Sequence, residues 1–510
     1  MAFIGIDVGT SSVKGVLVGD DGAVLHIASN KYDFDMPKPG WTETPAARWW
    51  THTVTVLREL SAKGHDIVGV GLTGQMHGSV LLDSDSLGRG GRDEIDSIRP
   101  ALMWNDQRTV EQCVQITEAF GGAHGCVEQL GSAALPGLTL PKLLWVKQNE
   151  PERWARVCAV CLPKDFVALQ LTGVLAGDVG DLSGTLMLSP ATRRWNRTSL
   201  DLLGIDDSVL PAVHESSDVV GRVTAWSAAQ TGLAEGTPVV VGSGDNQAAA
   251  IGAGVTEPGQ LMIVLGTSGV VLAPSVEPKP DLEGPGRLHL FCDATGSAGS
   301  PGGYVLTGCM LSAAGSLEWA RSVLAAGERF DVMMDEASAV GAGSDGLMFL
   351  PHLTGERCPY ADPTARGGWI SATRAHTRGH LVRAVVEGVC IGLAQIKDMI
   401  GDLAGEPHEV RLTGGAAKSA LWRQILADCL GLPVAPVAVD EGPAYGAAIL
   451  GAVGVGRAGS VSELSSAWVS MGEETTPGMD RGVYGALGER YRDAYGSLRP
   501  IWEHIEKDRI

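Results

Sequence analysis

The sequence is short of aromatic residues and of positive charge. Phenylalanine, tryptophan and tyrosine make up 5% of its 510 residues, and 39 lysines and arginines face 59 aspartates and glutamates, a formal net charge of −20. Such an excess of negative charge argues against nucleic acid or an anionic membrane surface as a partner. An anionic ligand would therefore need a local positive site or a metal ion.

Long apolar segments and paired cysteines are also missing. No run of about 18 apolar residues is present, so no membrane span is expected. The first residues lack the basic start and the apolar stretch of a signal peptide. Nine cysteines are scattered along the chain, an odd number that favours a reduced, cytoplasmic protein. Cys158 and Cys161 form a lone CxxC, which without a second ligand pair indicates a buried strand rather than a redox or zinc site.

The length predicts two domains, because single hydrophobic cores stop growing near about 250–300 residues. The 69 glycines predict many tight turns and close backbone approaches. Strands alternate with helical stretches along the chain, as in IVGVGLTG and TPVVVGSGDNQAAAIGAG. This alternation predicts an α/β architecture with a mixed sheet.

The chain opens on FIGIDVGTSSVK, an apolar strand that ends at Asp7 before a Gly-Thr-Ser turn and Lys14. A strand–turn–strand of the same kind, QLMIVLGTSGVVLAPS, begins the second half. The two Gly-Thr-Ser turns, at Gly9 and Gly266, lie 257 positions apart (266 − 9). We interpret them as equivalent parts of two related domains that meet near residues 254–259. Only the first copy carries the acid, since Val264 stands opposite Asp7.

Both Gly-Thr-Ser turns are candidate phosphate loops. Backbone N–H groups and hydroxyls of such turns can point at phosphate oxygens, and Lys14 could add a positive charge. Neither turn is a Walker A loop, because GxxxxGK[ST] does not occur. Either turn alone would be read as an ordinary hairpin; the pair favours phosphate binding. The GxGxxG at Gly454–Gly459 follows a helical stretch instead of a strand, so it does not predict a Rossmann site.

A second acid, Asp245, follows the strand of GSGDNQ and stands at or near the N-cap of a helix predicted from Gln247. A helix N-terminus favours an ionised carboxylate. Such a carboxylate could accept the proton of a substrate hydroxyl that attacks phosphorus. The alternative is a plain N-cap aspartate.

Two further strand ends carry polar and aromatic side chains. GQMHG places Met76 and His77 in a glycine-flanked turn, and MWND places Trp104, Asn105 and Asp106 at the end of another strand. A flat ring over C–H faces beside amide and carboxylate groups suits a polyol. Structural use in a turn or cap is the alternative for each of them.

Together these strings resemble the FGGY family of carbohydrate kinases, within the actin-like ATPase superfamily, over nearly the whole chain. The most specific strings are GQMHG, LWVK with LPKD, GSGDNQAAAIGAG, LGTSG, HLTGERCPYADPTARG and LTGGAAKS. The resemblance implies two ribonuclease-H-like domains, residues 1–254 and 255–510, with the site in the cleft between them. The first would hold the sugar site, one phosphate loop and the base, and the second would hold the other phosphate loop and the adenosine site.

The resemblance also implies roles, position by position. Asp245 would be the catalytic base and Asp7 would act on Mg²⁺ through water. The sugar would be held by Met76, His77, Trp104, Asn105, Asp106 and Asn246. ATP would be held by Thr10, Ser11, Lys14, Gly266, Thr267, Ser268, Gly414, Gly415 and Ala416. GQMHG and MWND are similar to the sugar-site strings of members that phosphorylate D-xylulose at O5.

Three positions depart from the family pattern: Lys14 where some relatives have arginine, Tyr445 where leucine is frequent, and Cys358 where threonine is frequent. Three other activities stay open at this point: a kinase of the family for ribulose, gluconate, glycerol or a similar polyol; an actin-like ATPase that is not a kinase; and a silent sugar sensor. The sequence also leaves the oligomeric state open, a homodimer included.

Overall fold

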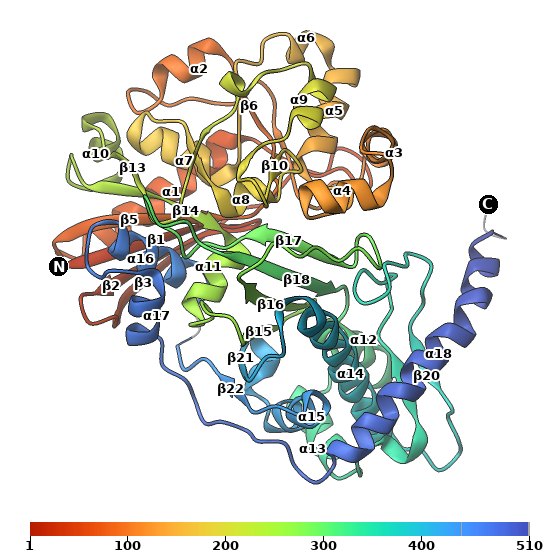
Figure 1. Ribbon diagram of the computed structural model, residues 1–510. Coiled ribbons are helices and arrows are strands. Elements are labelled where there is room, and N and C mark those ends of the chain that lie inside the picture. The colour runs from red at the N-terminus through yellow and green to blue at the C-terminus, as the bar shows by residue number, and fades with distance from the viewer. Residues whose placement is uncertain (440, 508–510) are drawn as a thin grey trace.

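The computed structural model describes residues 1–439 and 441–507 and contains two six-stranded mixed sheets (Figure 1). The first sheet has the order β13-β14-β5-β1-β2-β3, with bounds β13 (Val219–Arg222), β14 (Pro238–Gly244), β5 (Ile67–Gly74), β1 (Ala2–Val8), β2 (Ser12–Gly19) and β3 (Val24–Lys31). The second has the order β17-β18-β16-β15-β21-β22, with bounds β17 (Leu288–Cys292), β18 (Tyr304–Met310), β16 (Gly269–Ser275), β15 (Gln260–Leu265), β21 (Glu409–Thr413) and β22 (Val434–Pro436).

The two sheets repeat one pairing pattern. In the first, β1 is antiparallel to β2 and parallel to β5; in the second, β15 is antiparallel to β16 and parallel to β21. The two strand–turn–strand units predicted from the sequence therefore occupy equivalent places. In the first sheet Asp7 lies beside Lys14 and Thr73, whereas Val264 in the second lies beside Val270 and Thr413.

Helices cover the sheets, and five short strand pairs lie outside them. The remaining strands are β4 (Glu43–Thr44), β6 (Val80–Leu82), β7 (Ala101–Leu102), β8 (Ala159–Cys161), β9 (Ala176–Asp178), β10 (Leu188–Ser189), β11 (Arg194–Trp195), β12 (Ala212–His214), β19 (Met348–Leu350) and β20 (Gly368–Ile370). Helices of the first half are α1 (Ala46–Ser61), α2 (Ser84–Arg89), α3 (Val110–Ala119), α4 (Ala123–Leu130), α5 (Thr139–Asn149), α6 (Pro151–Trp154), α7 (Pro163–Thr172), α8 (Val179–Ser183), α9 (Arg197–Leu203), α10 (Ala225–Thr231) and α11 (Asp245–Gly252). Those of the second half are α12 (Ala314–Leu324), α13 (Phe330–Ser338), α14 (Arg378–Ala404), α15 (Ala420–Leu430), α16 (Pro443–Gly454), α17 (Val461–Trp468) and α18 (Arg481–Lys507).

The central strands of the first sheet are buried on both faces. Helix α1 packs on β2 and β3, and α16 packs on β1 and β5. Strand β1 therefore reads as a continuous buried run, AFIGIDV, rather than an alternation of apolar and polar residues. Helix α16 comes from the far end of the chain, so a segment of the second half covers one face of the first sheet. Figure 1 shows α16 beside β1 and β5.

The backbone of α16 lies unusually close to the backbone of the first sheet. A Cβ atom added to Gly5 would come within 1.9 Å of the Ala444 carbonyl oxygen, and one added to Gly71 within 1.9 Å of that of Ala447. Only glycine allows two backbones to approach so closely. These two glycines therefore set the distance between α16 and the sheet.

Most of the predicted elements are confirmed, and three predicted boundaries are wrong. Helix α11 begins at Asp245 with Gly244 as its N-cap, not at Gln247. The sequence also predicts that the helix of HLVRAVVEGVCIGLAQIKDMIG ends at Gly401 and that the C-terminal helix is interrupted at Pro500. Instead, α14 continues to Ala404 and α18 continues through Pro500. Pro500 is exposed, so water can bond the carbonyl group that a proline leaves without an intrahelical partner. The CxxC stretch does enter a strand, β8, although Cys158 itself is exposed.

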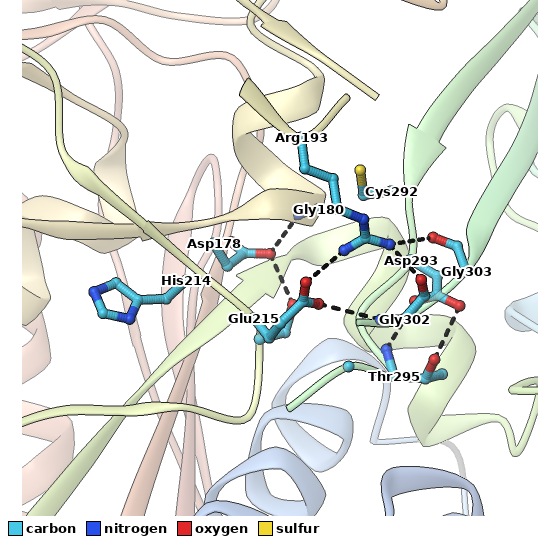
Figure 2. A network of polar contacts seen from close by, with 12 residues as sticks. Asp178, Gly180, Arg193, His214, Glu215, Cys292, Asp293, Thr295, Gly302 and Gly303 are labelled. Atoms are coloured by element: carbon cyan, nitrogen blue, oxygen red, sulfur yellow. Dashed lines mark hydrogen bonds and ion pairs between the residues drawn. The ribbon is translucent and has the colours of Figure 1, made fainter. Parts of the chain in front are cut away.

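Polar contacts join the two halves of the chain (Figure 2). Arg193 donates to the carboxylate of Glu215 at 2.6 Å and to the carbonyl of Gly303 at 2.9 Å. The backbone N–H of Cys292 on β17 donates to the Ser183 hydroxyl at 3.0 Å. Strand β17 of the second sheet is thereby fixed against α8 of the first half.

Helix α14 is the one helix, among the residues the structure describes, that is long and apolar enough to cross a membrane. Of its most apolar 18-residue window, 78% is buried inside the protein. That burial is typical of a core helix. It packs against α12, α13 and α15.

We predict that Gly71→Ala destabilises the protein because the added methyl group overlaps the Ala447 carbonyl, which is backbone and cannot turn away. The free energy of unfolding should fall by about 3 kcal/mol, the upper part of the usual range for overpacking. Gly88→Ala is the control, since a Cβ there meets nothing within 4 Å. Equal denaturation midpoints for both variants would contradict the close approach.

Candidate active site

Three cavities follow one another: the inner and connecting cavities are lined by residues of both halves of the chain, and the outer cavity is lined by residues of the second half. The inner cavity, of about 320 Å³, is lined by Met76, His77, Trp104, Leu135, Pro136, Gly137, Leu138, Asp245, Asn246, Ser268, Val270, His289, Phe291, Thr307, Cys309 and Arg357. The connecting cavity, of about 270 Å³, shares Asp245, Asn246 and Val270 with it and also reaches Gly414 and Pro443. The outer cavity, of about 720 Å³, is lined by Gly266, Thr267, Gly415, Ala416 and side chains of α12, α13 and α15.

Asp245 stands where the inner and connecting cavities meet. It is the first residue of α11, delivered by the buried strand β14. Burial raises its pKa to about 6, and the backbone N–H groups of the helix start oppose that rise. A carboxylate with this pKa is ionised at neutral pH and can still accept a proton readily, which is what a general base needs.

Asp7 lies near the end of β1 and is partly buried. Its Oδ1 atom is buried and has no hydrogen-bond partner among the residues the structure describes. Burial and, to a smaller extent, repulsion from Asp245 raise the pKa of Asp7 and Lys14 lowers it, with a net value of about 7. The structure therefore holds two carboxylates that repel each other at one end of the cleft, beside an unsatisfied oxygen.

These carboxylates fit a magnesium ion that arrives with a nucleotide. Mg²⁺ prefers oxygen ligands, and it keeps several waters and binds through one or two carboxylates plus substrate phosphates. The unpartnered Oδ1 of Asp7 supplies such an oxygen. Among the residues described, no group of three or more His, Cys, Asp or Glu side chains could hold a metal by itself. A water-mediated role for Asp7 is consistent with both observations.

The first Gly-Thr-Ser turn is tied to the inner cavity. Trp104 Nε1 donates to Thr10 Oγ1 at 2.8 Å, and the Gln75 amide donates to the Gly9 carbonyl at 3.1 Å. Ser11 is exposed on the same turn. Lys14 forms an ion pair with Glu441 at 2.7 Å. The sequence predicted separate phosphate and sugar groups, whereas the structure joins Thr10 and Trp104 directly.

His77 is held by its backbone and kept neutral. It has a positive φ of 70°, and its carbonyl accepts from Thr139 Oγ1 at 2.9 Å and from Lys142 Nζ at 2.6 Å. The same ammonium group donates to the carbonyls of Leu102 and Met103, at the start of MWND. Burial, Lys142 and His289 lower the pKa of His77 to about 3, so its ring is uncharged at neutral pH.

Residues of MWND have different places. Trp104 lines the inner cavity. Asp106 is fully buried and accepts from the Thr42 backbone at 2.8 Å and from Arg108 at 2.7 Å. Asn105 accepts from the Thr42 hydroxyl at 2.7 Å. Neither Asn105 nor Asp106 lines the three cavities, so their assignment to the sugar stays a prediction.

The second sheet supplies a wall that the sequence reasoning missed. His289 stacks on Phe291 at 5.7 Å with 6° between the rings, and its Nδ1 lies 2.9 Å from the Ser132 hydroxyl. Arg357, from the string GERCPY, reaches the same cavity. GERCPY is part of one of the family-specific strings, but its spacing does not indicate which cavity Arg357 reaches.

The outer cavity also contains residues that were not predicted. They come from α13 and from the region after β21: Phe330, Asp331, Met334, Asp335, Lys418, Ser419 and Trp422. Of the glycines of LTGGAAKS, Gly415 lines the outer cavity and Gly414 lines the connecting one. Gly414 has a φ of 90°, and a Cβ there would come within 2.6 Å of the Leu265 carbonyl. Helix α13 carries no motif that could have placed it here.

Tyr445 and Cys358 lie behind the cavities. Tyr445 is buried on α16, where its hydroxyl donates to the Gly22 carbonyl at 2.7 Å. Cys358 is fully buried beside Cys309, to whose carbonyl its N–H donates at 3.1 Å. Burial raises the pKa of the Cys358 thiol well above its usual range. Neither side chain lines one of the three cavities.

The short helix α8 has Gly184 as its C-cap, which lies next to His77 and Met76 of the inner cavity. Asp178 caps it by accepting from the N–H of Gly180 at 2.8 Å, as Figure 2 shows. Asp178 also pairs at 2.9 Å with the ammonium group of Lys164, which is fully buried and pairs with Asp165 at 2.6 Å. The charged cluster fixes α8 and, at its end, Gly184.

Comparison with known proteins agrees with this geometry. The FGGY family of carbohydrate kinases matches with its N-terminal domain at residues 2–252 and with its C-terminal domain at residues 261–455. The chain belongs to the FGGY family of carbohydrate kinases. A Bacillus subtilis (strain 168) protein named xylulose kinase is 35% identical over 503 residues, 98% of this chain and 97% of that protein.

Solved structures have the same fold as this FGGY kinase. A xylulose kinase from Rhodospirillum rubrum is similar with a TM-score of 0.88 and 30% identity, covering 99% of this chain and 100% of the other. A gluconate kinase from Lactobacillus acidophilus has a TM-score of 0.90 and 25% identity, covering 99% of each chain. The two-domain α/β fold implied by the sequence is therefore confirmed.

We predict that Gly184→Ala weakens sugar binding by this FGGY kinase. The new methyl group would come within 2.8 Å of His77 Cε1 and 2.9 Å of Met76 Cε, so the imidazole ring must move into the inner cavity. The KM for the sugar should rise about tenfold, since small displacements of positioning groups have effects of this size. The KM for the nucleotide should stay unchanged, because Gly184 lines neither of the other two cavities. A parallel rise in both constants would contradict this account.

Proposed function

We propose that this FGGY kinase transfers the γ-phosphoryl group of MgATP to O5 of D-xylulose, giving D-xylulose 5-phosphate and ADP. The observation that carries the proposal is the position of Asp245, which lies on the wall shared by the inner and connecting cavities. A hydroxyl held at Asp245 from the inner side faces a phosphoryl group that enters from the connecting side. The relatives named xylulose kinases support the choice of sugar.

In the proposed reaction, Asp245 accepts the proton of the O5 hydroxyl as that oxygen attacks the γ-phosphorus. The bond from the γ-phosphorus to the β,γ-bridging oxygen breaks, and the leaving group departs as ADP. Phosphoryl transfer asks the protein mainly for positioning and charge stabilisation. Gly266 and Thr267 line the outer cavity and Ser268 lines the inner one, which supports a role for the second loop in holding phosphate oxygens.

Asp7 would hold the magnesium ion of MgATP through water, with its unpartnered Oδ1 as the acceptor. When bound, the ion neutralises charge that develops on the phosphate oxygens. Lys14, now paired with Glu441, would complete the first loop together with Thr10 and Ser11. Gly414, Gly415 and Ala416 would border the ribose and adenine.

The remaining sequence assignments enter the proposal unchanged. Met76, His77, Trp104, Asn105, Asp106 and Asn246 would hold the sugar. Residues 1–254 and 255–510 would be two domains that close on both substrates and exclude water. The cytoplasm is the expected location, and the oligomeric state, a homodimer included, stays open.

Gluconate is the second candidate substrate, because a gluconate kinase has the same fold at a TM-score of 0.90. ADP release measured with D-xylulose, ribulose, gluconate and glycerol separates the candidates. Family membership sets aside an actin-like ATPase that is not a kinase. A silent sugar sensor would bind sugar without releasing ADP in the same assay.

We predict that Asp245→Asn lowers kcat by about 10²–10⁴-fold, the usual contribution of a general base, leaves sugar binding nearly unchanged and does not lower the melting temperature. Since the pKa of Asp245 is raised to about 6, the wild-type kcat/KM for the sugar should fall as the pH drops below about 6, where the carboxylate is protonated. Asp201→Asn, at an exposed aspartate, is the matched control. Near-normal turnover by Asp245→Asn would contradict the assignment.

We predict that Asp7→Asn raises the magnesium concentration needed for half-maximal rate and also stabilises the free protein at alkaline pH. The pKa of Asp7 is raised to about 7 in the folded protein, so folding disfavours its ionised form. The wild type therefore loses stability as the pH rises from about 4 through 7. The variant avoids that loss, and its melting temperature at pH 8 without magnesium should be about 2–4 °C higher. The difference should vanish near pH 4.

An unchanged magnesium requirement would contradict the metal role of Asp7 even if the thermal shift appeared. An absent thermal shift at pH 8 would contradict the raised pKa of Asp7. The two measurements therefore test the two properties separately.

A further inference from the structure

The inner cavity has two chemically different ends. A row of paired residues crosses one face of the second sheet: Thr413 lies beside Val264, Val264 beside Val270, and Val270 beside Cys309. Thr413 and Val264 line the connecting cavity, Val270 lines both cavities, and Cys309 lines the inner one. The row thus runs from the nucleotide side to the sugar side, about 4.8 Å for each strand.

The far end of the inner cavity lies one strand beyond Cys309. Thr307 follows Cys309 on the same face of β18, because side chains alternate along a strand, and His289 on β17 pairs with Thr307. His289 and Thr307 line the inner cavity and do not line the connecting cavity. The far end is therefore about 10 Å across the sheet from Val270, beside which Asp245 and Asn246 line the cavity.

Arg357 belongs to this far end. Like His289, it lines the inner cavity and not the connecting one. Its positive charge lowers the pKa of both His77 and His289, which places the guanidinium near their rings. Asp245 shows no such influence of Arg357 on its pKa. The cavity thus has a carboxylate at the nucleotide end and a guanidinium at the other.

The backbone of Arg357 is fixed, while its guanidinium has no hydrogen bond or ion pair to the residues the structure describes. The N–H of Arg357 donates to Glu356 Oε1 at 2.9 Å, and the same oxygen accepts from the Leu311 N–H at 2.9 Å. Glu356 also lies 3.1 Å from His352 Nδ1. An arginine held this way presents five N–H donors and no acceptor to whatever fills the cavity.

The chemistry of a 2-ketopentose says what should meet those donors. In the furanose form of D-xylulose, O5 is the oxygen that closes the ring onto C2, so it has no free hydroxyl. Phosphorylation at O5 therefore requires the open chain, in which C2 is a ketone. A ketone oxygen accepts hydrogen bonds and donates none.

We propose that the guanidinium of Arg357 donates to the C2 ketone oxygen of the open-chain sugar, and so selects an open-chain 2-ketose while Asp245 holds O5. Arg357 is then a specificity-determining residue for the far end of the substrate. Because the His77 and His289 rings are neutral, Arg357 supplies the charged hydrogen-bond donor at the far end of the inner cavity. The proposal rests on the proposed function for the position of O5.

A first experiment compares the ketose with the alditols that reduction at C2 produces, xylitol and D-arabinitol. Inhibition constants of the alditols and the KM and kcat of D-xylulose are measured for the wild type, Arg357→Met and Arg357→Lys. Arg357→Met should lower kcat/KM for D-xylulose about 10–100-fold, the range for a lost hydrogen bond to a charged group, and change alditol inhibition less than about threefold. The kcat/KM of Arg357→Lys for D-xylulose should lie between those of the wild type and Arg357→Met, since lysine keeps the charge and loses the planar, forked set of donors of the guanidinium.

Arg374→Met is the matched control, because Arg374 is exposed and lines none of the three cavities. It removes the same charge without touching the site and should leave all the constants unchanged. Equal losses for ketose and alditols in Arg357→Met would overturn the proposal, because they would show a general effect on the cavity.

A second experiment observes the ketone itself. D-Xylulose labelled with ¹³C at C2 is bound at saturating protein without nucleotide. The wild type should show a bound ketone signal moved downfield from free ketone, as hydrogen bonding to a carbonyl requires, and Arg357→Met should lose that displacement. A hemiketal signal alone in the wild type, or an unchanged ketone signal in the variant, would overturn the proposal.

Failure of the proposed function would look different. It would appear in the wild type, as a preference for another substrate in the ADP-release panel. If that substrate is another 2-ketose, the same two experiments apply to it and its alditols. If it is glycerol or gluconate, which have no C2 ketone, the role given to Arg357 is overturned as well.

Discussion

The close contact between α16 and the first sheet is the constraint on which the cleft depends. Gly5 and Gly71 let the backbone of α16 lie directly on β1 and β5. Residues at the start of this helix, Gly442 and Pro443, line the connecting cavity. A segment of the second half therefore covers a face of the first sheet and also forms part of the wall of the connecting cavity.

The charged groups of the cleft lower the stability of the free protein and are suited to binding ligands. Asp7 and Asp245 both have raised pKa values, and the Oδ1 of Asp7 has no partner. At the far end of the inner cavity, Arg357 has a fixed backbone and a guanidinium that pairs with none of the residues described. Ligands of complementary charge would stabilise these groups. Such sites trade stability of the free chain for ligand binding.

Much of the fold could be predicted because it is local in sequence. The strand–turn–strand units at Gly9 and Gly266 and the strand leading to Asp245 are continuous segments, whose periodicity and turn residues are visible without any neighbour. The boundaries at Gly401 and Pro500 were wrong because tertiary burial and solvent exposure override local helix-ending signals.

The sequence by itself determined the two related α/β halves, the acid at the end of the first strand and the candidate base at Asp245. The tertiary structure alone decided that α16 crosses to the first sheet, that Trp104 bonds Thr10, and that His289 and Arg357 face the inner cavity. These contacts join residues 94 or more positions apart, so no local pattern encodes them. They arise because two sheets and their helices must bury their faces against one another, and the cleft is what that packing leaves open.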